Sequence, residues 1–224
     1  VPWSGSGKGL NWCLHGFTKP VSNWCERVLR EQGCLTAEPI YNKVKDFALE
    51  FYSDGQGEVR FAGYSVFSTN EHGAYTGNLL ASDGQIEESI ACCLSLEKLT
   101  GIREALRAEL ASIYGNTYTG YLGVDMMVCW SDKENGYRVH PCVEINMRMN
   151  MGVVARLFYD RFVAPGSKGC FAVEYVPDNE TLRARHEQDM HDYPLTVEQG
   201  RLASGYLPLV PVTGKSCYRA YGRI

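Results

Sequence analysis

The stretch that most constrains the fold is residues 141–150, PCVEINMRMN, in which apolar and polar side chains alternate. Glu144, Asn146 and Arg148 stand at every second position, with apolar residues between them. Successive side chains of a strand point to opposite faces of a sheet. If the extended segment continues to residue 148, an acid, an amide and a guanidinium share one face. The pattern therefore predicts a strand whose polar face either carries chemistry or is solvated.

Charge and apolar content argue against two classes of partner. The 224 residues carry a net charge of −4 and are 45% hydrophobic, as in an ordinary globular chain. Lys and Arg residues are scattered, so no nucleic-acid partner is expected. No apolar stretch reaches the roughly 18 residues that a membrane span needs, so no membrane partner is expected. Nine cysteines without a C-x-x-C spacing fit reduced thiols of a cytoplasmic protein.

Hydrophobic periodicity predicts an α+β fold. Apolar residues at every second position, or a run rich in β-branched and aromatic residues, predict a strand. Apolar residues at helical spacing predict a helix. Hairpins mixed with amphipathic helices indicate one main antiparallel sheet from residue 45 onward. A further short strand is expected to end near Pro39, and the segment after residue 162 is the least regular. The expected strands are 45–52, 58–67, 74–81, 120–128 and 137–146, and the expected helices are 22–32, 101–114 and 150–162.

A second acid precedes the alternating stretch. Asp125 lies in GVDMMV, on the strand before the polar turn at 131–136. If that turn closes a hairpin, Asp125 and Glu144 come close together. Two carboxylates and the Asn146 amide oxygen form an all-oxygen site of the kind that Mg²⁺ prefers, and Arg148 can clamp phosphate oxygens as a planar fork. The alternative is a solvated face with weak ion pairs.

A glycine-rich loop, SGSGKG, occupies residues 4–9. Glycines let backbone N–H groups approach phosphate closely. A Walker A loop is excluded, because it would need Gly at position 2 and Ser or Thr at position 9, where this chain has Pro2 and Gly9. The alternative is a plain surface turn. Together with the acids, the loop favours a nucleotide-binding site.

The order of these motifs resembles the ATP-grasp superfamily, in its carbamoyl-phosphate-synthase-like, carboxylate–amine ligase branch. VPWSGSGKGL is similar to the phosphate loop of that family, AEPIYNKVKDFALEF to its adenine hinge and ribose-side acid, and GVDMMV with VEINMRMNMG to its metal-binding strands. The resemblance implies two α+β lobes that clasp the nucleotide. Residues 1–40 would form part of the small lobe, and residues 41–224 the large lobe with the metal site. The domain that usually precedes this fold is not in this chain, which is therefore expected to be part of a longer protein.

The resemblance also implies a role for each matching residue. Asp125, Glu144 and Asn146 would hold one or two Mg²⁺ ions, and Arg148 would contact the transferred phosphoryl group. The phosphate loop would cover the ATP phosphates, the hinge would bind adenine, and an acid after it would bind ribose. These nucleotide-binding residues are Ser4, Gly5, Ser6, Gly7 and Lys8 of the loop, Glu38 and Ile40 of the hinge, and Asp46.

The activity that the resemblance implies is ATP-dependent ligation. A small-molecule carboxylate would attack the γ-phosphate to form an acyl phosphate and ADP, and an amine or another nucleophile would then displace phosphate. A homodimer is compatible with this reading. Two alternatives stay open: a nucleotide-binding module without turnover, and an ATP-dependent small-molecule kinase on the same fold.

Overall fold

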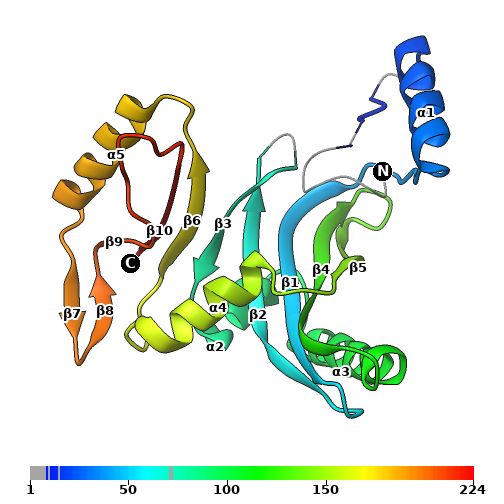
Figure 1. Cartoon of the computed structure of the whole chain (residues 1–224). Helices are drawn as coiled ribbons and strands as arrows, with labels where there is room; N and C mark the ends of the chain where they lie inside the picture. Colours follow the sequence, from blue (N-terminus) through cyan, green and yellow to red (C-terminus); the bar gives the residue numbers. More distant parts are fainter. Residues whose placement is uncertain (1–8, 10, 15, 71–72) are drawn as a thin grey trace. The chain divides into compact units, whose positions relative to one another are not determined.

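A computed structural model describes residues 9, 11–14, 16–70 and 73–224 of the chain. The chain divides into two compact units. The first spans Val1–Tyr41 and Thr69–Tyr75, and the second spans Asn42–Ser68 and Thr76–Ile224. The second unit holds the main sheet and four of the helices (Figure 1). The division of residues 1–40 and 41–224 into two nucleotide-clasping lobes stays a prediction.

The first unit contains helix α1, Lys19–Gln32. It begins earlier than the expected Ser22, because Thr18 is the N-cap and a proline occupies the first turn, where its missing N–H costs nothing. It ends at Gly33, whose φ of 79° is the left-handed conformation that favours glycine. The prediction of a strand that ends near Pro39 is wrong, because residues 34–41 form no strand. Proline has no N–H to contribute to a sheet.

The second unit is built on an eight-stranded sheet in the order β5-β4-β1-β2-β3-β6-β10-β9. The pairs β5–β4, β4–β1, β1–β2, β3–β6, β6–β10 and β10–β9 are all antiparallel. The expected α+β class and main antiparallel sheet are confirmed. The strands are β1 (Asn42–Asp54), β2 (Val59–Thr69), β3 (Tyr75–Leu80), β4 (Thr119–Ser131), β5 (Gly136–Asn146), β6 (Gly169–Tyr175), β9 (Tyr206–Pro208) and β10 (Tyr218–Arg223), with a separate ribbon of β7 (Thr196–Glu198) and β8 (Arg201–Ser204).

Four helices accompany this sheet: α2 (Asp83–Ala91), α3 (Leu96–Tyr114), α4 (Met151–Phe162) and α5 (Asn179–Asp192). Helix α3 starts before the expected residue 101, directly after its N-cap Ser95. Helix α5 lies in the segment that looked least regular. Its only buried residue is Leu182, so it has no apolar stripe from which to predict it. None of the helices in the described ranges is long and apolar enough to cross a membrane.

The two faces of the sheet are covered differently. Phe47, Leu49 and Phe51 of β1 are fully buried in a core that also contains apolar side chains of α2 and α3. On the opposite face, small residues such as Gly63 and Gly123 let α4 approach the strands closely (Figure 1). An apolar layer therefore supports one side of the sheet, while the other side is open to polar groups next to α4.

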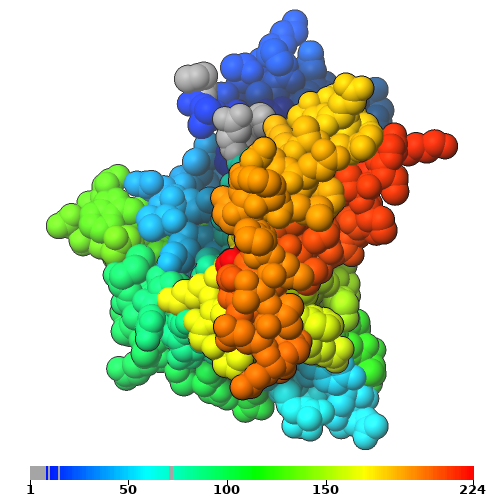
Figure 2. Space-filling model, turned by 90° about the vertical axis from the view of Figure 1, so that its left-hand side faces the viewer, coloured from blue at the N-terminus to red at the C-terminus, as the bar shows by residue number. Residues whose placement is uncertain are grey.

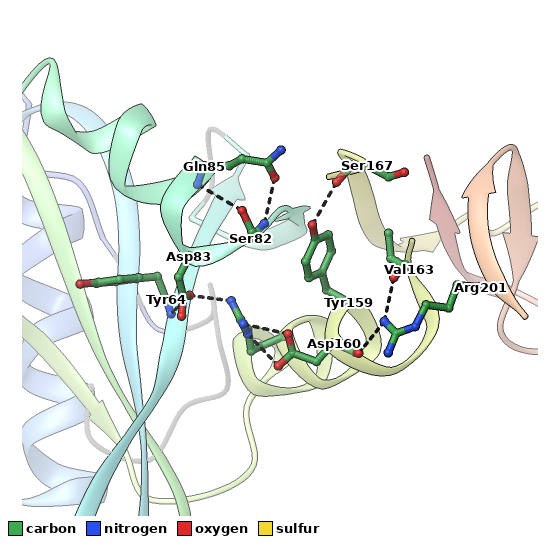
Figure 3. Close-up of polar contacts among 10 residues, drawn as sticks. Tyr64, Ser82, Asp83, Gln85, Tyr159, Asp160, Val163, Ser167 and Arg201 are labelled. Carbon is green, nitrogen blue, oxygen red and sulfur yellow. Dashed lines mark hydrogen bonds and ion pairs between the residues drawn. The ribbon is translucent and has the colours of Figure 1, made fainter. Parts of the chain in front are cut away.

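Polar contacts hold α4 at its middle and at its C-terminal end (Figure 3). The guanidinium of Arg156 pairs with Asp83, the first residue of α2, and with Asp160 one turn further along α4. Arg201 donates to the backbone carbonyls of Asp160 at 2.8 Å and Val163 at 3.0 Å. These carbonyls lie in the last turn, where a helix leaves acceptors unsatisfied. The position of α4 therefore rests on specific bonds as well as on apolar packing.

Helix α5 and the β7–β8 ribbon form an exposed face of the second unit, gold to orange in Figure 2. Arg219 of β10 ties α5 to the sheet. Its guanidinium is 5% exposed and donates to Glu174 of β6 at 2.7 Å and to Asp189 of α5 at 2.6 Å. Burying a charge is costly unless it is paired, so these two carboxylates account for the buried arginine.

Candidate functional site

Strands β1, β4 and β5 place the predicted acids on one face of the sheet. Asp125 of β4 lies directly opposite Glu144 of β5, and Gly123 lies directly opposite Asn146. On its other side, Asp125 pairs with Ala48 of β1. Opposed residues of antiparallel strands point to the same face, with Cβ atoms about 4.5–5.5 Å apart. The structure therefore brings the two carboxylates and the amide together.

Hydrogen bonds connect three of these side chains in a row. Asn146 donates from Nδ2 to Oδ2 of Asp125 at 3.1 Å. Arg148 donates from Nη2 to Oδ1 of Asn146 at 3.0 Å. Strand β5 ends at Asn146, as the expected strand 137–146 does, so the condition under which Arg148 would share the face of that strand is not met. Arg148 instead lies in the turn before α4 and reaches back, and its own N–H donates to the Asn146 carbonyl at 2.9 Å.

Electrostatic repulsion is built into this cluster. The pKa of Asp125 is raised to about 6. Burial is the largest cause, and the negative charge of the nearby Glu144 is the second. The hydrogen bond from Asn146 opposes this shift. Asp46, at the start of β1, adds to the repulsion. A cation near Asp125 and Glu144 would relieve the cost of keeping both carboxylates ionised.

The remaining predicted nucleotide-binding residues are distributed over both units. The loop residues Ser4, Gly5, Ser6, Gly7 and Lys8 lie outside the described residues. Glu38 and Ile40 belong to the first unit and are exposed. Asp46 belongs to the second unit, where its carboxylate pairs with Lys43. The roles of these eight residues stay predictions.

Glu50 of β1 is a polar residue that the sequence analysis did not single out. It is only 1% exposed. Its Oε1 accepts a hydrogen bond from Ser65 Oγ, and its Oε2 accepts one from Asn150 Nδ2, both at 2.9 Å. Burial raises the pKa of Glu50 to about 7. In the sequence, Glu50 alternates with apolar residues in the same way as Asp46, so nothing marks it as buried.

Two glycines make room for the Glu50 carboxylate. A Cβ atom on Gly123 would lie 2.4 Å from Glu50 Oε2 and 2.1 Å from Asn150 Nδ2. A Cβ atom on Gly152 would lie 2.1 Å from Glu50 Oε1 and 2.4 Å from Ser65 Oγ. These distances are too short for any real carbon, so a side chain at either position would displace the polar groups. The glycines are therefore part of the same arrangement.

A groove of about 410 Å³ also borders Glu50. Its walls include Tyr52 and Tyr121, whose rings meet edge to face at 5.1 Å, and Arg156 of α4. Asp125, Glu144, Asn146 and Arg148 do not line it. The chemistry of the acids, rather than the size of a cavity, identifies the candidate site.

The donor set of the candidate site fits Mg²⁺. In the part of the chain that the structure describes, no three His, Cys, Asp or Glu side chains gather as a metal site. The cluster instead offers two carboxylates, Asp125 and Glu144, and the amide of Asn146. Mg²⁺ is commonly held through one or two carboxylates, with water and substrate phosphates completing its shell. Asp125 and Glu144, which face each other on neighbouring strands, supply two such carboxylates.

Comparison with known proteins identifies the fold. No family model matches the chain, and no curated protein matches it. The chain is similar to the biotin carboxylase domain of Hydrogenobacter thermophilus 2-oxoglutarate carboxylase, with a TM-score of 0.53 and 12% identity over 98% of this chain and 50% of that one. Two further similar structures are biotin carboxylase from Campylobacter jejuni (TM-score 0.45, 11% identity, 90% and 47% covered) and L-amino acid ligase from Bacillus licheniformis (0.46, 13%, 88% and 53%). The chain spans about half the length of these proteins, which are ATP-grasp enzymes.

Proposed function

This chain has the ATP-grasp fold, and on that premise we propose that it is an ATP- and Mg²⁺-dependent ligase. It activates a small-molecule carboxylate as an acyl phosphate, which an amine or another nucleophile then attacks. The observation that carries the proposal is the bonded series Asp125–Asn146–Arg148 with Glu144 opposite Asp125. Carboxylates and an amide beside a guanidinium are groups that can hold Mg²⁺ and meet the charge of a transferred phosphoryl group.

The chemistry places little covalent work on the protein. A carboxylate oxygen attacks the γ-phosphorus, the bond to the bridging oxygen breaks, and ADP leaves with the electron pair. The amine nitrogen then attacks the acyl carbon, phosphate leaves, and the amine loses a proton. Asp125, Glu144 and Asn146 would hold Mg²⁺, which when bound offsets phosphate charge. Arg148 presents a planar, charged fork to the transferred group, oriented by its bond to Asn146.

The similar Hydrogenobacter domain supports the choice of cofactors. That structure is a complex with MgADP, ADP and bicarbonate. A magnesium nucleotide and a small oxyanion are therefore ligands of a protein with this fold. For this chain, the two carboxylates supply the charge that a magnesium nucleotide would need.

We also propose a cytoplasmic setting with small-molecule partners and no nucleic-acid or membrane partner. All nine cysteines lie in the described ranges and all are free, which supports a reducing compartment. A homodimer is compatible with this proposal. The exposed apolar side chains of the edge strand β5, Val143 and Ile145, lie where a second chain could pair.

The decisive experiment for the proposed function is ADP release by the full-length protein. A panel of carboxylic acids is tested with and without amines, and products are identified by mass spectrometry. An amide product together with ADP supports the ligase. A stable phosphorylated product that forms without amine would support the small-molecule kinase, and nucleotide binding without ADP release would support the module that does not turn over.

MgATP is expected to stabilise the protein. At a concentration one hundredfold above its dissociation constant, the gain in unfolding free energy should be about 2.7 kcal/mol. A thermal-shift titration of the full-length protein measures it. The matched control is the same titration with EDTA. Absence of any shift with MgATP would contradict the ATP proposal, and an equal shift with EDTA would remove Mg²⁺ from it.

A further inference from the structure

The turn that carries Arg148 is short and is anchored at both ends. On its N-terminal side, Asn146 is the last residue of β5. On its C-terminal side, Asn150 is the N-cap of α4, and its Oδ1 accepts the backbone N–H of Val153 at 2.8 Å. Only residues 147–149 lie between these anchors. A displacement of Asn150 must therefore move Arg148, which is two residues away.

The second anchor depends on Glu50. Asn150 is 8% exposed, and its Nδ2 donates to the Glu50 carboxylate at 2.9 Å. The side-chain amide of Asn150 cannot flip, because a flip would lose the hydrogen bond that the backbone N–H of Val153 donates to its oxygen. Its buried N–H group therefore needs an acceptor in the sheet, because an unpaired buried donor is costly. Glu50 is that acceptor.

The amide of Asn150 lies over the gap that Gly123 leaves in the sheet. Glu50, Gly123 and Asn146 are directly opposed residues on the neighbouring strands β1, β4 and β5, so they form one row on the same face. The middle member has no side chain, and a Cβ atom there would lie 2.1 Å from Asn150 Nδ2. The amide of Asn150 therefore occupies the space above Gly123, between Glu50 and Asn146. Asn146 is the residue that accepts a hydrogen bond from the Arg148 guanidinium.

We infer that Glu50 is a positioning residue for Arg148: its buried carboxylate holds Asn150 and so sets the place of the turn from which Arg148 reaches the reacting phosphoryl group. This inference rests on the proposed function, which gives Arg148 its role. Glu50 does not bond to Arg148 itself. Its bonds go to Ser65, which fixes the carboxylate on β2, and to Asn150. A buried carboxylate is costly, and packing alone would be better served by an apolar side chain.

Three variants isolate the contact between Glu50 and Asn150. Asn150→Asp keeps the helix cap, because Asp caps as well as Asn, but it sets a second carboxylate against Glu50. Glu50→Gln keeps an acceptor for Asn150, because the amide oxygen of Gln can take the place of Glu50 Oε2. Its NH₂ group then faces the Ser65 hydroxyl, which can accept as well as donate. The double variant Glu50→Gln/Asn150→Asp restores the hydrogen bond with donor and acceptor exchanged. It also has the same formal charge as the wild type.

At about pH 8 and saturating substrates, Asn150→Asp is expected to lower kcat roughly ten- to hundredfold, because a small misplacement of a reacting group costs that much. The dissociation constant for MgATP should change much less. Glu50→Gln should turn over at nearly the wild-type rate, and the double variant should recover most of the loss. Since the double variant keeps Asp at position 150, its recovery would show that the added charge near Arg148 was not the cause.

Ser53→Ala is the matched control. Ser53 lies on the same strand as Glu50, is fully buried, and donates from Oγ to the Tyr118 carbonyl at 2.7 Å. Its removal should lower the melting temperature without changing kcat. The inference is overturned if Asn150→Asp turns over like the wild type, or if the double variant recovers stability but not kcat. If Asn150→Asp does not fold, Gly123→Ala replaces it, because a Cβ atom at position 123 would displace the same amide of Asn150. Wild-type turnover in Gly123→Ala would then overturn the inference.

Hydrogen exchange separates failure of this inference from failure of the proposed function. If the wild-type protein shows no turnover with any substrate, the proposed function fails. Exchange in the peptide 147–153 then decides about Glu50. It should be faster in Asn150→Asp than in Ser53→Ala and should return to the wild-type rate in the double variant. Unchanged exchange in Asn150→Asp would overturn the inference.

Discussion

Replacing Arg148 with lysine is expected to lower kcat about a hundredfold to a thousandfold, which corresponds to about 2.7–4 kcal/mol in the barrier. Lysine keeps the positive charge but loses the planar fork that binds two phosphate oxygens at once. It also cannot reproduce the guanidinium geometry that bonds to Asn146 at 3.0 Å. Because the contact develops with the transferred charge, the dissociation constant for MgATP should stay near the wild-type value. Steady-state rates and calorimetric titration measure the two quantities separately.

Arg138→Lys serves as the control for this substitution. Arg138 lies on the same strand β5, and its side chain is 60% exposed and paired with Glu134. An exposed pair of this kind contributes at most about 1 kcal/mol, so turnover should not change. If Arg148 were likewise only part of a solvated pair, Arg148→Lys would behave like Arg138→Lys. Wild-type turnover in Arg148→Lys would retire its proposed role.

Glu144→Gln is expected to weaken Mg²⁺-dependent nucleotide binding by at least about tenfold. The substitution keeps the size of the side chain and removes one of the two charges that would face the proposed metal ion. Glu144 is exposed, so the fold should lose little stability. Calorimetric titration of Mg²⁺ at fixed ATP measures the effect. This result would differ in kind from that of Arg148→Lys, because it changes binding rather than the rate of the chemical step.

Glu134→Gln is the matched control for the metal site. Glu134 is also an exposed acid of the β4–β5 hairpin, but it lies at the turn and pairs with Arg138. Its substitution should leave Mg²⁺ dependence as it is. Unchanged Mg²⁺ dependence in Glu144→Gln would show that the carboxylate is only solvated, and the proposed metal site would have to be abandoned.

Local pattern in the sequence was enough to predict strands β1 to β5 and the acids on one face of β4 and β5. Alternation in residues 137–146 predicted β5, and the polar turn at 131–136 predicted the hairpin that sets Asp125 opposite Glu144. These features depend on neighbours along the chain, where a period of two and turn chemistry decide the outcome. The phosphate-loop and hinge assignments rest on the family resemblance instead, and they stay predictions.

Other features were decided only by contacts between distant parts of the chain. Alternation shows which face of β1 carries Glu50, but it does not show that α4 covers that face. The bond from Asn150 to Glu50 joins residues one hundred positions apart. Gly123 reads as an ordinary strand residue until the Asn150 amide is seen above it.

The end of β5 shows the same division. The sequence alternates through Arg148, but the strand stops at Asn146, and the chain then turns to Asn150, which caps α4 and bonds to Glu50. Pattern along the chain shows which residues carry charge, which alternate, and where the hairpin turns. Which acid is buried, and which side chains Arg148 and Asn150 contact, became clear only from the folded chain, because burial and contacts depend on the element that packs against a strand.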